Sequence, residues 1–349
     1  MKDVWPDAAS AFYFDYHARL VNTVISFLGL LSNIFHFSIL IRKSLRSSPV
    51  FSMMFVICIC DLLQLLTQTQ NDIKYILEFN QPDFCLGFDT YYATALTLTM
   101  ETLGGFSMLV SSCLVILVAL FRSLSIKFAM SKWSSTLAKT STARKTSLIV
   151  IIISAMYNLS ATHFKYKITP KSDDAFCAFS FYTGASSERR LYSASDGHSS
   201  TNAILLFTLF DGLIQIFQLI VFIFTSLILS RFIKEASSMK MMKSKSDRQA
   251  EKTEGLILFT LCSFFISTFP IIIANFMLPL FANLQIIPLI LIRTLTISTM
   301  LQTINAATHG WVCLLMSSQY RAVAKTAFSP DHSVNAIAPA VEPSNASDG

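Results

Sequence analysis

The feature that most constrains this chain is a series of long apolar segments. A transmembrane helix needs about 20 mostly apolar residues, because the hydrocarbon core of a bilayer is about 30 Å thick. Seven segments of the 349-residue chain meet this requirement. They lie near residues 19–41, 50–70, 97–121, 147–164, 201–232, 255–278 and 286–316. The pattern predicts an all-α integral membrane protein, a bundle of seven transmembrane helices.

The composition supports lipid as the main solvent of this chain. Hydrophobic residues make up 53% of the sequence and charged residues only 14%, whereas soluble domains are about 25% charged. The net charge of +6 does not indicate nucleic-acid binding, because the cations lie in short segments between the apolar runs. No cleavable signal precedes the first apolar run, so we expect that run to act as both signal and span.

The distribution of Lys and Arg predicts the orientation in the membrane, because cytoplasmic loops carry an excess of both. The segments after the first, third and fifth spans are rich in Lys and Arg, whereas the segment between the second and third spans leans acidic. We therefore expect a multi-pass protein of the plasma membrane with its N-terminus outside and its C-terminus in the cytoplasm.

Four regions follow from this arrangement. Residues 1–18 form an extracellular N-terminus and residues 19–316 the transmembrane domain. Residues 317–328 have an apolar helical face that includes Tyr320 and predict a short amphipathic helix on the inner membrane surface. Residues 329–349, rich in Ser, Pro and Ala, predict a disordered tail.

Polar residues inside the apolar segments are informative, because an ionisable group in lipid costs about 2.5–3.5 kcal/mol and usually faces the bundle interior. Asp61 lies in the middle of the second segment, and Asn33 of the first segment is a candidate partner. Two interpretations stay open for Asp61: hydrogen bonding that holds helices together, or a part in a conformational switch.

Three further charges lie at similar depth near the outer side. Glu101, Asp211 and Arg293 belong to the third, fifth and seventh segments, and together they predict an outward-open, ligand-binding cavity. The alternative is that Arg293 pairs with Glu101, or that these side chains reach the lipid headgroups.

The remaining special residues indicate structure rather than catalysis. His36 and His309 lie inside apolar segments without the three converging ligands that a catalytic metal needs, so we expect structural hydrogen bonds, no metal, no cofactor and no enzymatic activity. Pro270 should kink the sixth helix. Five cysteines lie in apolar runs and should pack as small hydrophobic residues, whereas Cys85 and Cys177 lie in polar segments.

With these residues placed, the chain resembles the rhodopsin-like G-protein-coupled receptors over about residues 19–328. More narrowly, it is similar to the nematode serpentine chemoreceptors of class W, relatives of the FMRFamide-type neuropeptide receptors. The resemblance rests on the order and spacing of NIFHFSILIRKSLRSS, ICICDLL, ALFRSLSIK, FDGLIQ and NAATHGWVCLLMSSQYR.

The resemblance implies roles for individual residues. Asn33 and Asp61 match the polar pair of the first two helices, and Arg122 matches the arginine of the Asp-Arg-Tyr motif, which couples to the G protein. Pro270 matches the proline of the sixth helix, about which that helix swings. Two interpretations stay open for Arg122. If it only marks the end of an apolar helix, any cationic side chain would serve; if it couples to the G protein, its planar guanidinium is required.

The resemblance also implies a disulfide between Cys85 and Cys177, which suits the oxidising outer compartment. Other positions depart from the family pattern. Phe121 replaces the acid before the arginine, Thr268 replaces the tryptophan of the sixth helix, and His309 stands for the asparagine of the Asn-Pro-x-x-Tyr motif.

The predicted function is that of a receptor. An extracellular ligand, a neuropeptide or chemosensory cue of peptide or small-molecule nature, shifts the helices so that a heterotrimeric G protein binds inside. The partners are this ligand, the G protein and membrane lipids, with no nucleic acid. Two alternatives remain: a transporter of a small polar solute, and a diverged receptor-like protein with weak or no coupling.

Overall fold

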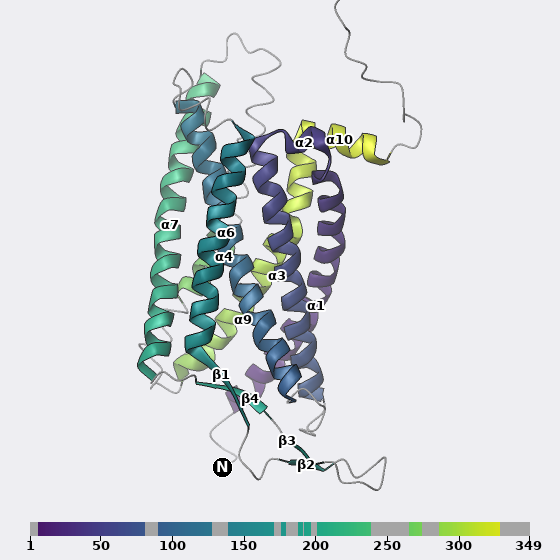
Figure 1. Ribbon diagram of the computed structural model, residues 1–349, viewed down its shortest axis with the longest axis vertical. Coiled ribbons are helices and arrows are strands. Elements are labelled where there is room, and N and C mark those ends of the chain that lie inside the picture. Colours follow the sequence, from purple (N-terminus) through teal and green to yellow (C-terminus); the bar gives the residue numbers. More distant parts are fainter. Residues whose placement is uncertain are drawn as a thin grey trace, which may run out of the picture.

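The computed structural model describes residues 6–80, 90–127, 139–170, 176–178, 188–190, 192–196, 201–238, 265–273 and 286–328. These residues form a bundle of long helices that run roughly side by side (Figure 1). The long helices are α1 (Pro6–Leu40), α3 (Pro49–Asn80), α4 (Tyr91–Lys127), α6 (Thr140–Lys165), α7 (Thr201–Ser238) and α9 (Ile286–Met316). The short helices are α2 (Lys43–Arg46) and α10 (Ser318–Phe328), and residues 265–273 are also helical.

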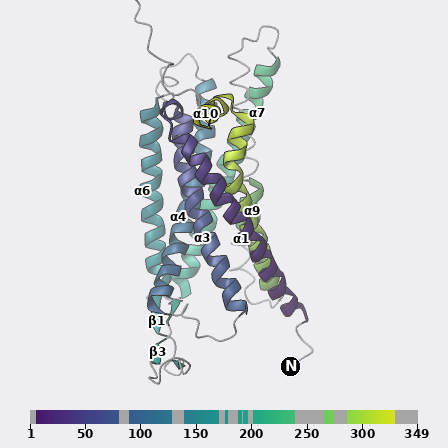
Figure 2. The same cartoon turned by 90° about the vertical axis from the view of Figure 1, so that its right-hand side faces the viewer.

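The two ends of the bundle differ in what covers them. The start of α1 and the strands of the described residues lie at one end, whereas α2 and α10 lie at the other (Figures 1 and 2). We call these the amino-terminal end and the α10 end. The C-terminal helix α10 thus lies at the opposite end from the start of α1, as an odd number of crossings requires.

The outward faces of the helices are apolar. On α6, the exposed large side chains include Ile149, Ile152, Ile153, Met156 and Leu159, a spacing of three or four residues that places them on one helical face. In water such a face would be an unusually large apolar patch, whereas in a bilayer it is the surface that contacts lipid.

Five segments of the described residues are long and apolar enough to cross a membrane. They are Phe12–Leu40, Pro49–Asn80, Tyr91–Phe121, Thr140–Lys165 and Leu209–Ile228. The helix α9 has 31 residues, and at 1.5 Å per residue it is about 46 Å long, which exceeds the hydrocarbon thickness.

Several helices are longer than their apolar segments. The first helix begins at Pro6 rather than near residue 19, and α3 ends at Asn80 rather than near residue 70. Asp72, expected in a loop, is therefore a helical residue. The prediction of its position was wrong because hydropathy marks only the part of a helix that meets hydrocarbon, and a helix continues wherever its polar side chains find partners.

The segment between α6 and α7 contains two pairs of antiparallel strands that the sequence analysis did not predict. The first pair is β1 (Tyr166–Pro170) with β4 (Tyr192–Asp196), and the second is β2 (Phe176–Ala178) with β3 (Glu188–Arg190). The hydroxyl of Thr94 on α4 donates to the carbonyl of Tyr192 at 3.3 Å. This contact holds β4 against α4 at the amino-terminal end.

The helix α1 packs along both α3 and α9, and glycines allow the close approach to α9. A Cβ added to Gly29 would lie 2.8 Å from the Cβ of Ala307, and one added to Gly310 would lie 2.9 Å from the Cβ of His36. Both distances are shorter than van der Waals contact. The two glycines therefore let the backbones of α1 and α9 approach more closely than any other residue would allow.

Candidate functional site

A polar cavity lies between α4, α6 and α7 near the amino-terminal end, with a volume of about 250 Å³. It contains two of the three charged residues that the sequence analysis assigned to a ligand cavity, Glu101 from α4 and Asp211 from α7. Tyr157 and Lys165 of α6 also line it. Tyr166, the first residue of β1, lines it as well, so this strand contributes to its wall.

Asp211 is held by α6. The ammonium Nζ of Lys165 lies 2.7 Å from Asp211 Oδ2, and the hydroxyl of Tyr157 donates to Asp211 Oδ1 at 2.5 Å. The side chains of Lys165 and Asp211 are 18% and 32% exposed. The ion pair neutralises Asp211, so this carboxylate mainly joins α6 to α7. The sequence analysis missed both partners, and Lys165 lies just beyond the fourth apolar segment, near residues 147–164.

Glu101 has a different environment. It is exposed on the cavity wall, and no ion-pair partner lies within 4 Å among the described residues. Lys74 on the neighbouring helix α3 forms its ion pair with Glu78, at 3.7 Å. The cavity therefore presents one carboxylate without a direct ion pair among the described residues, and a cationic group of a ligand can pair with it.

The floor of the cavity is formed by polar groups of three helices. The side-chain amide Nε2 of Gln218 on α7 donates to the hydroxyl of Ser112 on α4 at 3.1 Å. The hydroxyl of Thr268, within the helical residues 265–273, is buried without a hydrogen-bond partner among the described residues. A buried hydroxyl without a partner costs free energy, and a ligand atom or a water in this cavity would satisfy it.

Arg293 does not line this cavity. Its guanidinium carbon lies 5.9 Å from the centre of the Phe14 ring, so it packs between α9 and α1. The prediction that Glu101, Asp211 and Arg293 share one cavity was therefore wrong for Arg293. The three residues do lie toward the same end of their helices, but the direction in which each side chain points depends on how the helix is rotated in the bundle.

A buried hydrogen-bonded pair joins α3 to α9 closer to the α10 end. Nδ1 of His309 lies 2.6 Å from Asp61 Oδ2, and the hydroxyl of Ser111 on α4 donates to Asp61 Oδ1 at 3.4 Å. Asp61 and His309 are 1% and 4% exposed. Among the described residues no group of three His, Cys, Asp or Glu side chains is arranged to hold a metal.

Asn33 is not the partner of Asp61. Its amide Nδ2 donates to the carbonyl of Ala306 on α9 at 2.9 Å and to that of Gly29 at 3.0 Å. The expected pair was thus wrong, although both residues connect α9 to its neighbours. The thiol of Cys58 donates to the Asn33 carbonyl at 3.5 Å, which links α1 to α3 at the same level.

The second intramembrane histidine connects α1 to the surface helix. Nδ1 of His36 lies 2.8 Å from the hydroxyl of Tyr320 on α10, and Tyr320 is only 1% exposed. Burial raises the pKa of the Tyr320 hydroxyl, so this hydroxyl stays protonated. The predicted structural hydrogen bonds of His36 and His309 are both confirmed.

Other predicted site residues are only partly described. Arg122 lies in the last turns of α4, toward the α10 end, but its side chain lies outside the described residues. The same holds for the disulfide, because Cys85 and the side chain of Cys177 are outside them. Pro270 lies within the helical residues 265–273. The cysteines Cys58, Cys60, Cys113 and Cys313 are free, as expected of residues in apolar runs.

Comparison with known proteins identifies a family. The model of the family described as "Serpentine type 7TM GPCR chemoreceptor Srw" matches residues 20–330 of the chain. Comparison with curated proteins gives no match. The matched range contains every long helix of the bundle except the first turns of α1.

Proposed function

The chain belongs to the serpentine 7TM GPCR chemoreceptor family Srw, and on this premise we propose that it is a plasma-membrane receptor that couples ligand binding outside to a G protein inside. The family supports a receptor role. The observation that carries the finer proposal is the cavity between α4, α6 and α7, in which Glu101 has no ion-pair partner among the described residues.

The ligand in this proposal is a cation, either an amidated peptide with an Arg or amine, or a chemosensory amine. Glu101 forms a charge-assisted hydrogen bond with the cationic group, the strongest class of hydrogen bond in a site of this kind. Asp211 is already paired with Lys165, so its role is to position α6 against α7. Ligand binding stabilises one arrangement of helices over another and shifts the population toward it.

Coupling takes place at the α10 end in this proposal. The amino-terminal end faces outside, in keeping with the Lys and Arg of the predicted inner segments. The buried pair of Asp61 and His309, and the contact of His36 with Tyr320, connect α9 to α3 and α1 to α10. A movement of the helices at the cavity thereby reaches α10 and Arg122. The helix containing Pro270 swings outward and opens the crevice in which the G protein docks.

Charge reversal at Glu101 tests the ligand part. Cells that express the receptor are screened with amidated peptides and small amines, with GTP exchange on a heterotrimeric G protein as the readout. For a cationic ligand found in this way, Glu101→Lys should lower potency about 100-fold or more, because a charge-assisted bond of about 1.5–3 kcal/mol is replaced by repulsion. Glu78→Lys is the matched control, since Glu78 lies on α3 outside the cavity.

Arg122 tests the coupling part. Arg122→Ala should keep ligand binding and abolish GTP exchange, and Arg122→Lys should restore little, because Lys lacks the planar fork of a guanidinium.

Unchanged potency in Glu101→Lys would show that Glu101 does not bind the cationic group of the ligand. Ligand-dependent flux of a solute into vesicles, without GTP exchange, would favour a transporter over a receptor.

A further inference from the structure

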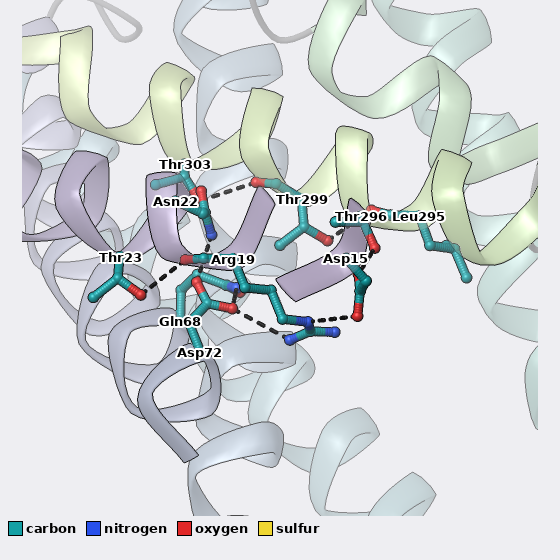
Figure 3. Close-up of polar contacts among 10 residues, drawn as sticks. All are labelled: Asp15, Arg19, Asn22, Thr23, Gln68, Asp72, Leu295, Thr296, Thr299 and Thr303. Atoms are coloured by element: carbon teal, nitrogen blue, oxygen red, sulfur yellow. Dashed lines mark hydrogen bonds and ion pairs between the residues drawn. The ribbon is translucent and has the colours of Figure 1, made fainter. Parts of the chain in front are cut away.

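A second polar cavity lies between α1, α3 and α9, apart from the cavity between α4, α6 and α7. Its volume is about 390 Å³, within the range of small-molecule sites. Polar side chains of all three helices line it, and Leu295 and Met300 of α9 provide an apolar wall. Figure 3 shows the polar residues, which the sequence analysis did not identify as a site: Arg19, Asn22, Asp72, Thr296 and Thr299.

Asp72 is the centre of this cluster. Its side chain is fully buried and accepts three hydrogen bonds. Arg19 Nη1 at 3.2 Å and Gln68 Nε2 at 2.8 Å donate to Oδ1, and Asn22 Nδ2 at 2.7 Å donates to Oδ2. A carboxylate oxygen can accept two hydrogen bonds, so Oδ2 retains one lone pair beyond its contact with Asn22.

The cluster contains more negative than positive groups. The guanidinium of Arg19 is shared between Asp72 and Asp15, whose Oδ2 lies 3.0 Å from Arg19 Nε. The same guanidinium lies 4.4 Å from the centre of the Tyr75 ring. Among the described residues, these two carboxylates thus share the one guanidinium of Arg19.

The wall also presents hydrogen-bond acceptors. Asn22 is 1% exposed, and its Oδ1 has no hydrogen-bond partner among the described residues. The hydroxyl of Thr299 donates to the carbonyl of Leu295 at 2.9 Å, and that of Thr296 donates to Asp15. A hydroxyl has one proton to donate, so Thr299 has only lone pairs left to offer.

We propose that this cavity is a second ligand site, and that it binds a small cation, a primary ammonium or guanidinium group with an apolar body. The cationic group donates hydrogen bonds to Asn22 Oδ1 and Thr299 Oγ1, and it balances the excess carboxylate. The apolar body packs against Leu295 and Met300. The site goes beyond the receptor function proposed above, since it is a separate cavity and its occupancy does not require G-protein coupling.

The test uses 2-phenylethylammonium as the probe and the full chain in nanodiscs at neutral pH. Thermal unfolding is measured at rising probe concentration, because a ligand that binds only the folded state raises the melting temperature. 2-Phenylethanol serves as the neutral analogue of the same shape, and 3-phenylpropanoate as the anionic one. The ammonium should stabilise the protein, and the two analogues should not.

Two variants and a matched control locate the probe. Thr299→Val removes an acceptor of the cavity wall while it leaves every contact of Asp72 in place, and Asn22→Ala removes the acceptor without a partner. Each should weaken binding of the probe about tenfold, the loss of one hydrogen bond to a charged group. Thr23→Val is the control, because the Thr23 hydroxyl also donates to a carbonyl of its own helix, that of Arg19 at 2.9 Å, but does not line the cavity.

Several outcomes would overturn the proposal. Equal stabilisation by 2-phenylethanol would show a purely apolar contact, and no stabilisation by the ammonium would mean that the cavity holds water only. If Glu101→Gln weakened binding of the probe and Thr299→Val did not, the ammonium would bind in the cavity between α4, α6 and α7 instead. None of these results bears on GTP exchange, so failure of this site and failure of the receptor function can be told apart.

Discussion

Asp72 and Glu101 are both carboxylates in membrane-crossing helices, on the neighbouring helices α3 and α4, yet their surroundings are opposite. Asp72 is fully buried and accepts hydrogen bonds from Arg19, Asn22 and Gln68. Glu101 is exposed to a cavity and has no ion pair among the described residues. The difference arises from the adjacent helices, because α1 places a guanidinium and an amide beside Asp72.

The comparison teaches that a charge in a membrane helix does not by itself mark a ligand site. A buried charge with several donors joins helices, and losing a partner is costly because the other partner remains buried and unpaired. A carboxylate that lines a cavity and has no ion-pair partner in the protein can instead pair with a cationic ligand. The substitutions below test this distinction and the helix packing around it, from the largest expected effect to the smallest.

His309→Ala should cause the largest loss, about 3–5 kcal/mol in the free energy of unfolding. The substitution leaves Asp61 buried with only the long contact to Ser111 and also opens a cavity. Chemical unfolding in detergent measures it. His17→Ala is the control, since His17 is exposed on α1, and it should change the free energy by less than about 0.5 kcal/mol. Equal losses in both variants would contradict the role of the buried pair.

Asp72→Ala tests the comparison directly and should cost about 3 kcal/mol, because three donors lose their acceptor and Arg19 loses one of its two carboxylates. Glu101→Ala should cost less than about 0.5 kcal/mol, since no described partner is left unpaired. Chemical unfolding measures both variants. If the free energy of unfolding depends on denaturant concentration with the same slope in both, their unfolding midpoints can be compared directly. The comparison fails if Glu101→Ala is the more damaging of the two.

Gly310→Ala tests whether the close packing of α1 on α9 depends on the missing side chain. The added Cβ would lie 2.9 Å from the Cβ of His36, so the helices must separate, at a cost of about 1–3 kcal/mol. Gly105→Ala on α4 is the matched control, because its Cβ would meet only the end of the Asn158 side chain, at 3.1 Å. Melting temperatures in the same detergent should fall for the first and change little for the second.

Lys165→Met should have only a small effect on stability, about 0.5–1 kcal/mol, because the pair with Asp211 is partly exposed. It should increase the selectivity of the cavity for cations. Without Lys165, Asp211 loses its ion pair and becomes a second unpaired carboxylate in the cavity that contains Glu101. Binding of a cationic ligand found in the receptor screen should strengthen several-fold. Unchanged affinity would indicate that Asp211 does not face the ligand.

The candidate site was only partly predictable from the sequence. Glu101 and Asp211 could be identified because a charge stands out in an apolar segment, and the same reasoning identified Asp61. Their partners Lys165, Tyr157 and His309 could not be assigned, because they come from helices that are 46, 54 and 248 residues away in the chain. Asp72 was missed because it lies beyond the second apolar segment, and Arg19 because it is the first residue of the first segment, where a charge does not stand out.

The sequence by itself determined that the chain lies in lipid as a helical bundle, because the length and apolarity of each segment follow from local composition and the thickness of a bilayer. It also determined which residues are costly in that environment. Only the tertiary structure decided which of them meet: Asp61 with His309 rather than Asn33, and Arg293 with Phe14 rather than Glu101. The reason is geometric, since the rotation and tilt of each helix set the direction of its side chains, and both depend on packing among all the helices at once.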